Sequence, residues 1–464
     1  MAETCSHTFH ELGSEMRIVI AGSGIAALWA RDAVLSTGVP ADVTMISRDT
    51  EAPYSKVALP KYVSGQIGRD SVFLRVAAKK PAGAGTGRQD PAWLRGTSLI
   101  SIDRAAHTVA TAGPSGHGQV PYDRLILALG ATPCGRFGLP FWTLDDADQI
   151  KALAAAGKTV AIAGGGFVGL RLATALPRTG MKVTVFEREE HVMPGRIPPR
   201  FADCLEDTLG RAGVEVRTHV VMDSLERIAD GWEVRLESPG HVHETLKFDL
   251  AVDCTGTFPS TTLATNAGLD ISARGILVDQ CQRTSDPDIL AAGDCAAVTH
   301  TSGELRSAGV WHQASAQGRV AGLVAVGAPV QSPPSTGWHT FEIPDPENLC
   351  GATVELGQTG PVPRVACSFG DLVPLETDRI LESGDPAGDS YRYAVLREGL
   401  VSGYFTTAGP SELGGLIERL GKLDVRLEEI STAWYPSPFS IIAGPETLPV
   451  GPGNAKVTVK GRLE

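Results

Sequence analysis

Two stretches of the chain, about 140 residues apart, repeat one pattern of apolar and polar positions. Residues 17–38 read RIVIAGSGIAALWARDAVLSTG and residues 159–180 read TVAIAGGGFVGLRLATALPRTG. Each stretch begins with a short apolar run, continues through a glycine-rich turn, and then carries apolar residues three or four positions apart. This pattern predicts a buried strand, a tight turn and an amphipathic helix. A second strand-like run follows each helix, at residues 41–49 and 181–189.

The turn in each copy has the spacing Gly-x-Gly-x-x-Gly/Ala. The first glycine permits the tight turn, the second lets the backbone approach a pyrophosphate, and the third position lets the helix pack on the strand. The helix N-terminus then offers free N–H groups and a partial positive charge to the phosphates. These positions are Gly22, Gly24 and Ala27 in the first copy and Gly164, Gly166 and Gly169 in the second.

An acidic residue follows the second strand of each copy, at Asp49 and at Glu187. A carboxylate there accepts hydrogen bonds from the ribose hydroxyls of an adenosine. The sequence therefore predicts two bound dinucleotides that exchange electrons. Glu187 favours NAD over NADP because a carboxylate repels the 2′-phosphate, although the neighbouring Arg188 leaves NADP open.

The remaining pattern predicts an α/β fold with two Rossmann-like dinucleotide-binding domains, the second inserted in the first, and a C-terminal α+β domain. We expect the first domain at 14–136 and 256–332, and the inserted one at 137–255. A Pro/Ser-rich linker, QSPPSTG, precedes the third domain at 336–464. That part combines strand-like runs such as YRYAVLREGLVSGYFTT with one helix, SELGGLIERLGKL.

Composition narrows the function classes. A length of 464 residues allows about three domains, and a formal net charge of −12 argues against nucleic acid as the main partner. The apolar runs are too short to cross a membrane, and the polar N-terminus does not resemble a secretory signal, so we expect a cytoplasmic protein. The eight cysteines form no CxxC pair, which argues against a disulfide framework. We expect no metal site.

Several longer motifs occur in one order along the chain: GSGIAA at 22–27, PYSKVALPKYVSG at 53–65, YDRLILALGATP at 122–133, GGGFVGLRLA at 164–173, DPDILAAGDCAAV at 286–298 and VWHQASAQGRVAG at 310–322. In this set the chain resembles the two-dinucleotide flavoprotein reductases of the pyridine nucleotide–disulfide oxidoreductase superfamily. It is most similar to the ferredoxin/rubredoxin-reductase-like group. The resemblance implies FAD in the first domain and a nicotinamide dinucleotide in the second. The C-terminal domain would cover the flavin edge or form a homodimer interface.

The resemblance also implies roles for individual residues. Asp294 would bond the ribityl chain of the flavin, and Trp311 would lie beside its ring. The expected FAD-binding residues are Gly22, Gly24, Ile25, Ala26, Ala27, Arg48, Asp49, Lys61, Leu99, Ala128, Leu129, Gly130, Gly293, Asp294 and Trp311. The expected nicotinamide-dinucleotide residues are Gly164, Gly166, Phe167, Val168, Gly169 and Glu187.

The chain departs from the family pattern at several positions. Residues 53–65 contain no redox cysteine, so electrons would leave the flavin directly. Lys61 would tune the flavin N5, but Arg171 stands where the family has a glutamate. Two such cations about 4 Å apart would repel by roughly 4 kcal/mol at an effective dielectric of about 20. Either Arg171 turns away, or an anion lies between them. Leu129 replaces a threonine, and Cys134 replaces an arginine for which Arg136 could substitute.

We therefore expect an FAD-dependent oxidoreductase that takes hydride from NADH and passes electrons to a separate acceptor, such as a ferredoxin- or rubredoxin-type protein. Lys61, Arg171 and Trp311 are the candidate catalytic residues. The alternative is a repurposed flavoenzyme that acts directly on a small organic substrate, with an altered nicotinamide site. One segment carries a local surplus of cations, and it would either steer an acidic ferredoxin or be a solvated loop without that role. These cations are Arg69, Arg75, Lys79, Lys80, Arg88 and Arg95.

Overall fold

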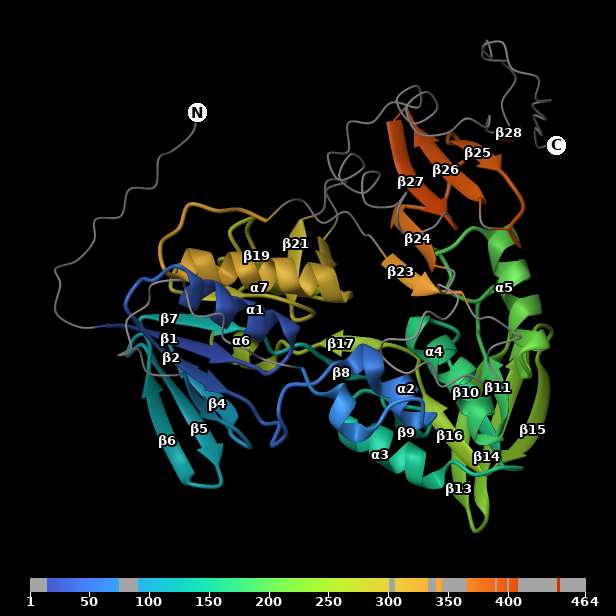
Figure 1. Cartoon of the computed structure of the whole chain (residues 1–464), viewed down its shortest axis with the longest axis horizontal. Coiled ribbons are helices and arrows are strands. Elements are labelled where there is room, and N and C mark those ends of the chain that lie inside the picture. Colours follow the sequence, from blue (N-terminus) through green and yellow to red (C-terminus); the bar gives the residue numbers. More distant parts are fainter. Residues whose placement is uncertain are drawn as a thin grey trace.

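The computed structural model describes residues 15–74, 91–299, 305–332, 339–343, 365–388, 390–398, 400–407 and 440–442. Within these ranges two sheets flanked by helices lie side by side, and a third sheet lies beside the second one (Figure 1). The α/β fold class predicted from the sequence is confirmed.

The first sheet is parallel and has the strand order β20-β7-β1-β2-β3. Its central strand β1 is buried from Ile18 to Ala21, which explains why its sequence is a continuous apolar run rather than an alternating one. Helices α1 (Ile25–Ser36) and α7 (Trp311–Ala325) pack together against this sheet. Its strands are β1 (Met16–Ala21), β2 (Ala41–Ile46), β3 (Ala92–Leu94), β7 (Arg124–Leu127) and β20 (Ile289–Ala291).

Smaller sheets complete this part of the molecule. A three-stranded antiparallel sheet contains β4 (Ser98–Asp103), β5 (Thr108–Gly113) and β6 (Gly116–Pro121). A four-stranded sheet contains β18 (Ile271–Ser272), β19 (Gly275–Val278), β21 (Ala296–Thr299) and β22 (Leu305–Ser307). Helix α6 (Thr262–Asn266) precedes β18. One buried cluster joins the first sheet to these elements.

The second sheet is also parallel, in the order β12-β11-β10-β16-β9. All five of its strands lie in sequence between β7 and β20 of the first sheet, so the second fold interrupts the first. Its strands are β9 (Leu139–Pro140), β10 (Thr159–Ala163), β11 (Lys182–Phe186), β12 (Val214–Arg217) and β16 (Leu250–Asp253). Its helices are α3 (Leu144–Leu153), α4 (Phe167–Ala175) and α5 (Pro199–Arg211).

The two crossings between the folds lie side by side. They are β8 (Ala131–Pro133) and β17 (Thr257–Pro259), which pair antiparallel. An antiparallel sheet of β13 (Val221–Ile228), β14 (Gly231–Ser238) and β15 (Val242–Phe248) extends the second fold. The segment after β2 contains short 3₁₀ turns at Lys56–Ala58 and Arg69–Val72 around helix α2 (Leu59–Val63). Another 3₁₀ turn, Leu176–Thr179, follows α4.

The C-terminal sheet is antiparallel, in the order β23-β24-β27-β26-β25-β28. Its strands are β23 (His339–Glu342), β24 (Val365–Gly370), β25 (Arg379–Ser383), β26 (Arg392–Arg397), β27 (Leu400–Thr406) and β28 (Ser440–Ile442). The strand-like run at 391–407 is thus the β26–β27 hairpin. The helix expected at SELGGLIERLGKL lies outside the described residues.

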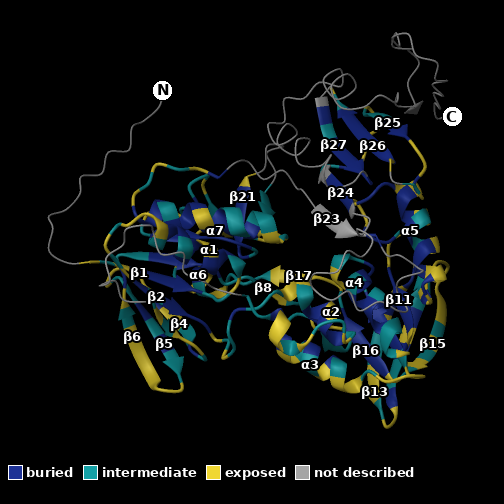
Figure 2. Cartoon of the chain, in the orientation of Figure 1, coloured by how far each residue is buried: buried dark blue, intermediate teal, exposed yellow. Residues whose placement is uncertain are grey.

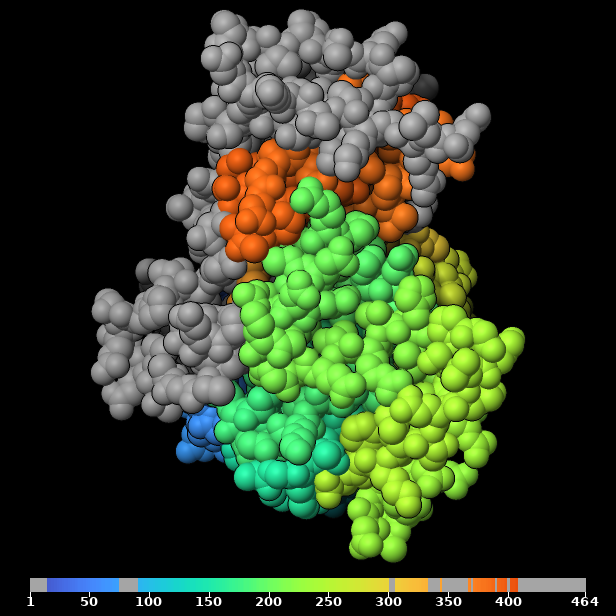
Figure 3. Space-filling model, turned by 90° about the vertical axis from the view of Figure 1, so that its right-hand side faces the viewer, coloured from blue at the N-terminus to red at the C-terminus, as the bar shows by residue number. Residues whose placement is uncertain are grey.

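This sheet packs against α5 of the second fold. The ring of Phe201 on α5 lies 4.6 Å from that of Phe405, and it stacks on Tyr391. One hydrophobic cluster joins both elements, and the space-filling view shows the sheet resting on the second fold (Figure 3). Buried residues also line the centres of both parallel sheets (Figure 2).

Candidate functional site

The first glycine turn joins β1 to α1. Gly22 has φ +131°, and a Cβ there would lie 3.0 Å from the Ala128 carbonyl carbon and closer still to its oxygen. Gly24 caps α1, and nothing lies within 4 Å of where its Cβ would be. Ala27 is fully buried. The turn is therefore closed against the protein at Gly22 and open at Gly24, which leaves the N-terminus of α1 accessible to a phosphate.

Asp49 lies beside this turn, although it is 25 residues further along than Gly24. The Ser23 hydroxyl donates a hydrogen bond to the Asp49 carboxylate. The Asp49 backbone N–H donates to the Ser47 hydroxyl at 3.0 Å, and the Gly96 N–H donates to the Asp49 carbonyl at 3.1 Å. These bonds hold the carboxylate at the carboxyl end of β2. Arg48 is exposed next to it.

Gly293 and Asp294 follow β20 and reach the same edge of the sheet. A Cβ on Gly293, which has φ +81°, would lie 3.0 Å from the Ala26 Cβ. The Asp294 carboxylate accepts a hydrogen bond from the Gly309 N–H at 3.0 Å. Burial raises the pKa of Asp294, while the hydrogen bond from Gly309 and the charge of Lys56 oppose that rise. The glycine turn, Asp49 and Asp294 thus converge at the carboxyl ends of parallel strands, where ligands of such sheets bind.

The other predicted flavin residues lie around this edge. Trp311 is the first residue of α7 and is 39% exposed. Ala128 follows β7 and is buried, while Leu129 is partly buried against the cluster that joins the first sheet to its smaller neighbours. The same cluster receives Leu99 from β4. The remaining members of the predicted set are Ile25 and Ala26 in the first turn of α1 and Gly130, which has φ +69°.

The sequence predicts a role for Lys61, and a second lysine of the same motif, Lys56, lies near these acids. Lys61 is on the exposed side of α2, which packs against α4, the helix of Arg171. The charge of Lys56 interacts with those of Asp49 and Asp294. Lys56 is the first residue of the 3₁₀ turn that precedes α2. Both lysines lie within residues 53–65, and the role of Lys61 stays a prediction.

The second glycine turn repeats the first. Gly164 has φ +100°, and a Cβ there would lie 2.8 Å from the Cys254 carbonyl carbon. Gly166 caps α4 with open space around it, and a Cβ on Gly169 would lie 3.3 Å from the Cys254 Cβ. Phe167 and Val168 open α4, and Val168 is 37% exposed. This turn also leaves a helix N-terminus accessible.

Glu187 is buried beside the second turn. Its carboxylate accepts hydrogen bonds from the Gly165 N–H at 2.7 Å and from the Glu189 N–H at 3.0 Å. The acid is therefore oriented by the glycine turn itself, as Asp49 is oriented by Ser23 in the first copy. Each carboxylate oxygen keeps a second lone pair with which it can accept a ribose hydroxyl.

The positions that depart from the family pattern lie in different settings. Arg171 is partly buried in the middle of α4. Cys134 is a free cysteine on the crossing next to β8, where its N–H donates to the Gly256 carbonyl at 3.0 Å. The backbone N–H of Arg136 donates to the Asp253 carboxylate. The guanidinium of Arg136 lies 5.7 Å from the Phe137 ring centroid. Arg136 is thus oriented toward the second fold.

The residues of the first fold fit an FAD. Its open turn at Gly24 can receive a pyrophosphate, Asp49 can accept hydrogen bonds from the adenosine ribose, and the Asp294 carboxylate lies at the same edge of the sheet. When bound, FAD supplies a ring that accepts hydride and releases electrons. The second fold offers the same donors and an acid for a nicotinamide dinucleotide. Among the described residues, no group of three or more His, Cys, Asp and Glu side chains is arranged to hold a metal ion.

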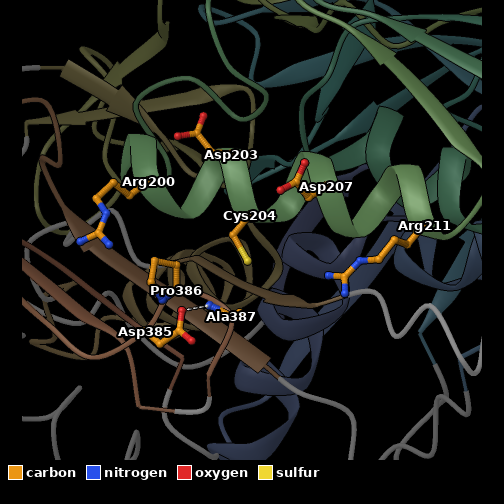
Figure 4. Close-up of a pocket in the computed structure, with 8 residues that line it drawn as sticks. All are labelled: Arg200, Asp203, Cys204, Asp207, Arg211, Asp385, Pro386 and Ala387. Carbon is orange, nitrogen blue, oxygen red and sulfur yellow. Dashed lines mark hydrogen bonds between the residues drawn. The ribbon is translucent and has the colours of Figure 1, made fainter.

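A cavity of about 620 Å³ lies elsewhere, between α5 and the turn that joins β25 to β26 (Figure 4). It is lined by Arg200, Asp203, Cys204, Asp207, Arg211, Asp385, Pro386 and Ala387. None of the predicted cofactor residues borders it. None of the described helices is both long and apolar enough to span a bilayer.

Comparison with known proteins agrees with this geometry. A model of the pyridine nucleotide-disulphide oxidoreductase family matches residues 16–318, and the chain belongs to that family. It is an FAD-dependent oxidoreductase of the class that uses flavin and nicotinamide cofactors. The resemblance inferred from the motifs is confirmed.

Two relatives and one solved structure illustrate the similarity. The NADH-dependent phenylglyoxylate dehydrogenase subunit epsilon of Aromatoleum evansii is 30% identical over 321 residues, which cover 68% of this chain and 73% of that protein. A terpredoxin reductase from a Pseudomonas species is 31% identical over 356 residues, which cover 73% and 82%. A covalent putidaredoxin reductase–putidaredoxin complex shares the fold, with a TM-score of 0.76 at 23% identity over 91% of this chain and 97% of that one.

Proposed function

We propose that the protein takes hydride from NADH onto an FAD in the first fold and passes the electrons to a separate small redox protein. One observation carries this proposal: both glycine turns are complete and open, and each has an oriented acid beside it. The turn of the first fold is held by Asp49, and that of the second by Glu187. The similar terpredoxin reductase and putidaredoxin reductase, by their names, act on small redox proteins.

The protein's part in this reaction is to bind and orient the two dinucleotides. The N-termini of α1 and α4 would neutralise the pyrophosphates, and Glu187 favours NADH because it would repel a 2′-phosphate. Residues 53–65, next to the proposed flavin site, contain no cysteine. We therefore propose that electrons pass to the acceptor without a thiol intermediate in the protein.

The test is anaerobic mixing of the FAD-loaded protein with NADH and, separately, NADPH. We expect NADH to bleach the flavin faster than NADPH does. In Glu187→Ala the difference between these two bleaching rates should be smaller. An acidic iron–sulfur ferredoxin added afterwards should be reduced. Bleaching by neither nicotinamide would contradict the proposal and would favour the alternative, in which a small organic substrate reduces or oxidises the flavin directly.

We further propose where an acidic acceptor docks. The basic segment expected from the sequence falls largely outside the described residues, and its first member, Arg69, pairs with Glu51 and Asp148. A different basic group lies across the two folds: Arg196 follows β11, Arg274 precedes β19 and Arg306 lies in β22.

The charges of Arg274 and Arg306 act on Arg196. Burial lowers the pKa of Arg196, and the charges of Arg306 and Arg274 lower it further. Such a local concentration of positive charge on a chain of net charge −12 would attract an acidic patch on a partner.

The docking proposal is tested with Arg274→Glu, a change in an exposed turn. We expect a several-fold rise in KM for an acidic ferredoxin at low salt and little change at 0.5 M salt, where charges are screened. The matched control is Arg235→Glu on the exposed side of β14, which should leave KM unchanged. Equal effects of the two reversals would contradict this location.

A further inference from the structure

The segment that follows β2 is held against the second fold by polar contacts with α3. The Leu144 N–H donates to the Tyr54 hydroxyl at 3.1 Å, and the Tyr62 hydroxyl donates to Asp148 at 2.5 Å. The Lys151 ammonium donates to the Tyr62 carbonyl at 2.6 Å. Lys56 lies between Tyr54 and Tyr62 in this segment. Its backbone is therefore fixed between the two dinucleotide folds.

The ammonium group of Lys56 lies over the ring of Trp142, 4.2 Å from the ring centroid. In the part of the chain that the structure describes, Lys56 makes no hydrogen bond or ion pair, in contrast to Lys151. An aromatic ring at this distance attracts a cation through its quadrupole, and tryptophan is the strongest of the aromatic residues in this respect. The indole is thus a direct contact of the Lys56 ammonium group.

Trp142 itself is held at both ends. Its indole N–H donates to the Ala131 carbonyl at 2.9 Å, which ties the ring to the crossing strand β8. Its backbone N–H donates to the Asp146 carboxylate at 3.0 Å. The same carboxylate accepts from the Thr143 N–H and completes the capping box of α3. The ring therefore stays in place beneath the lysine.

Charged groups surround Lys56 from three elements. Asp49 and Arg48 follow β2, Asp294 follows β20, and Asp146 lies in the first turn of α3. Burial of the ammonium group lowers the pKa of Lys56 to about 8, although the residue as a whole is exposed. The three carboxylates oppose that shift and Arg48 adds to it, but none of the acids is paired with the ammonium group.

We propose that Trp142 is a positioning residue that holds the Lys56 ammonium group over its ring, at the edge of the first sheet where the flavin would bind, and keeps it from pairing with the carboxylates around it. The inference rests on the proposed flavin site for its functional meaning. Held in this way, the lysine presents a positive charge and an exchangeable proton at the edge of the first sheet, near Asp49 and Asp294. A lysine paired with either acid would present neither.

The first test uses the protein without cofactor, so it does not depend on hydride transfer. The rate at which an acylating reagent modifies Lys56 is measured by peptide mass spectrometry from pH 6.5 to 10.5, because only the neutral amine reacts. We expect an inflection near pH 8 in the wild type and in Trp142→Phe, which keeps a ring. In Trp142→Ala the ammonium group gains water and carboxylate partners, so the inflection should rise by a unit or more. Modification at pH 8 then falls about fivefold for a rise of one unit, and further for a larger rise.

Exposed Lys158 in the same digest corrects for reagent concentration. The proposal would be overturned if the wild type and Trp142→Ala showed the same inflection. It would also be overturned if the inflection rose equally in Trp142→Phe and Trp142→Ala relative to the wild type. If Trp142→Ala does not fold, tryptophan fluorescence provides a second measurement that does not need this variant. The tryptophan fluorescence of the wild type should show a step near pH 8 that Lys56→Met lacks, and its persistence in Lys56→Met would overturn the contact.

The second test uses the FAD-loaded protein. The midpoint potential of the flavin, measured from pH 7 to 9, should change slope near pH 8 in the wild type and not in Trp142→Ala. An unchanged slope in the variant would overturn the role at the flavin. Failure of NADH to bleach the flavin, with the labelling results as expected, would contradict the proposed function alone.

Discussion

The contact between α1 and α7 makes the sharpest prediction, because it joins the glycine turn of the flavin site to the helix of Trp311. The two helices approach closely where α7 carries Gly318 and Gly322. A Cβ on Gly318 would lie 2.8 Å from the Ala26 Cα and closer still to its carbonyl oxygen, and real Cβ atoms essentially never approach below 3.0 Å. The clashing atoms belong to the α1 backbone, so no side chain can move aside.

Gly318→Ala should therefore separate the two helices by up to about 1 Å or strain them in place. Overpacking of this kind costs typically 1–3 kcal/mol. For a unit of this size that corresponds to a fall in Tm of roughly 2–10 °C. Because α1 also carries Gly24, we expect FAD affinity to weaken by roughly tenfold, which equals about 1.4 kcal/mol. Both quantities are measured by calorimetry, with thermal unfolding for Tm and FAD titration for Kd.

Gly210→Ala provides the matched control. Gly210 is also a helical glycine, in α5, but nothing lies within 4 Å of where its Cβ would be. Alanine there should leave FAD affinity unchanged and stabilise the helix by up to about 1 kcal/mol. If Gly318→Ala behaved like Gly210→Ala in both measurements, the close approach of α1 and α7 would not exist in the protein.

Three further predictions concern charge. Lys56→Met should make the cofactor-free protein more stable to urea at pH 7. Burial lowers the pKa of Lys56 from 10.5 to about 8, so between these pH values the unfolded wild-type chain binds more protons than the folded one. The wild type therefore gains stability above pH 8, and the stability advantage of Lys56→Met should shrink there. An advantage that stays constant with pH would refute this prediction. Burial also lowers the pKa of His312 from 6.5 to about 4, so the wild type should lose about 2 kcal/mol more stability than His312→Gln between pH 7 and pH 5. Urea midpoints that fall in parallel for the two proteins would count against this prediction. Asp148→Asn should cost about 1 kcal/mol at pH 7, because Tyr62 and Arg69 both donate to this partly exposed carboxylate. Burial raises the pKa of Asp148, but these hydrogen bonds lower it more. The difference in Tm between the wild type and Asp148→Asn should therefore vanish in acid. A difference that persists at pH 3 would show that the variant loses stability for another reason.

The sequence predicted both glycine turns and their acids because those features are local. A run such as RIVIAGSG specifies a strand and a turn within a few residues, and the left-handed φ of Gly22 follows from that turn. Asp49 and Glu187 were also found from the sequence, because the acid lies at a regular distance behind the turn in a βαβ unit.

The surroundings of Lys56 could not be predicted in this way. Lys56 lies five residues before Lys61 in one motif, but its charge interacts with that of Asp294 and lies over the ring of Trp142, and both partners are distant in sequence. Likewise, the strand-like run at 391–407 predicts part of an antiparallel sheet but not the packing partner of that sheet. The structure places that hairpin against α5 through Phe201 and Phe405.

The sequence alone thus determined that the chain has two dinucleotide folds in the order of a flavoprotein reductase, since hydrophobic period and turn glycines act over short distances. Only the tertiary structure decided which charges surround Lys56 at the edge of the first sheet. Electrostatic and cation–π interactions depend on separations of a few ångströms between residues that the chain brings together only when it folds. The Lys56–Trp142 contact, which joins a segment after β2 to the first residues before α3, is the clearest instance of this.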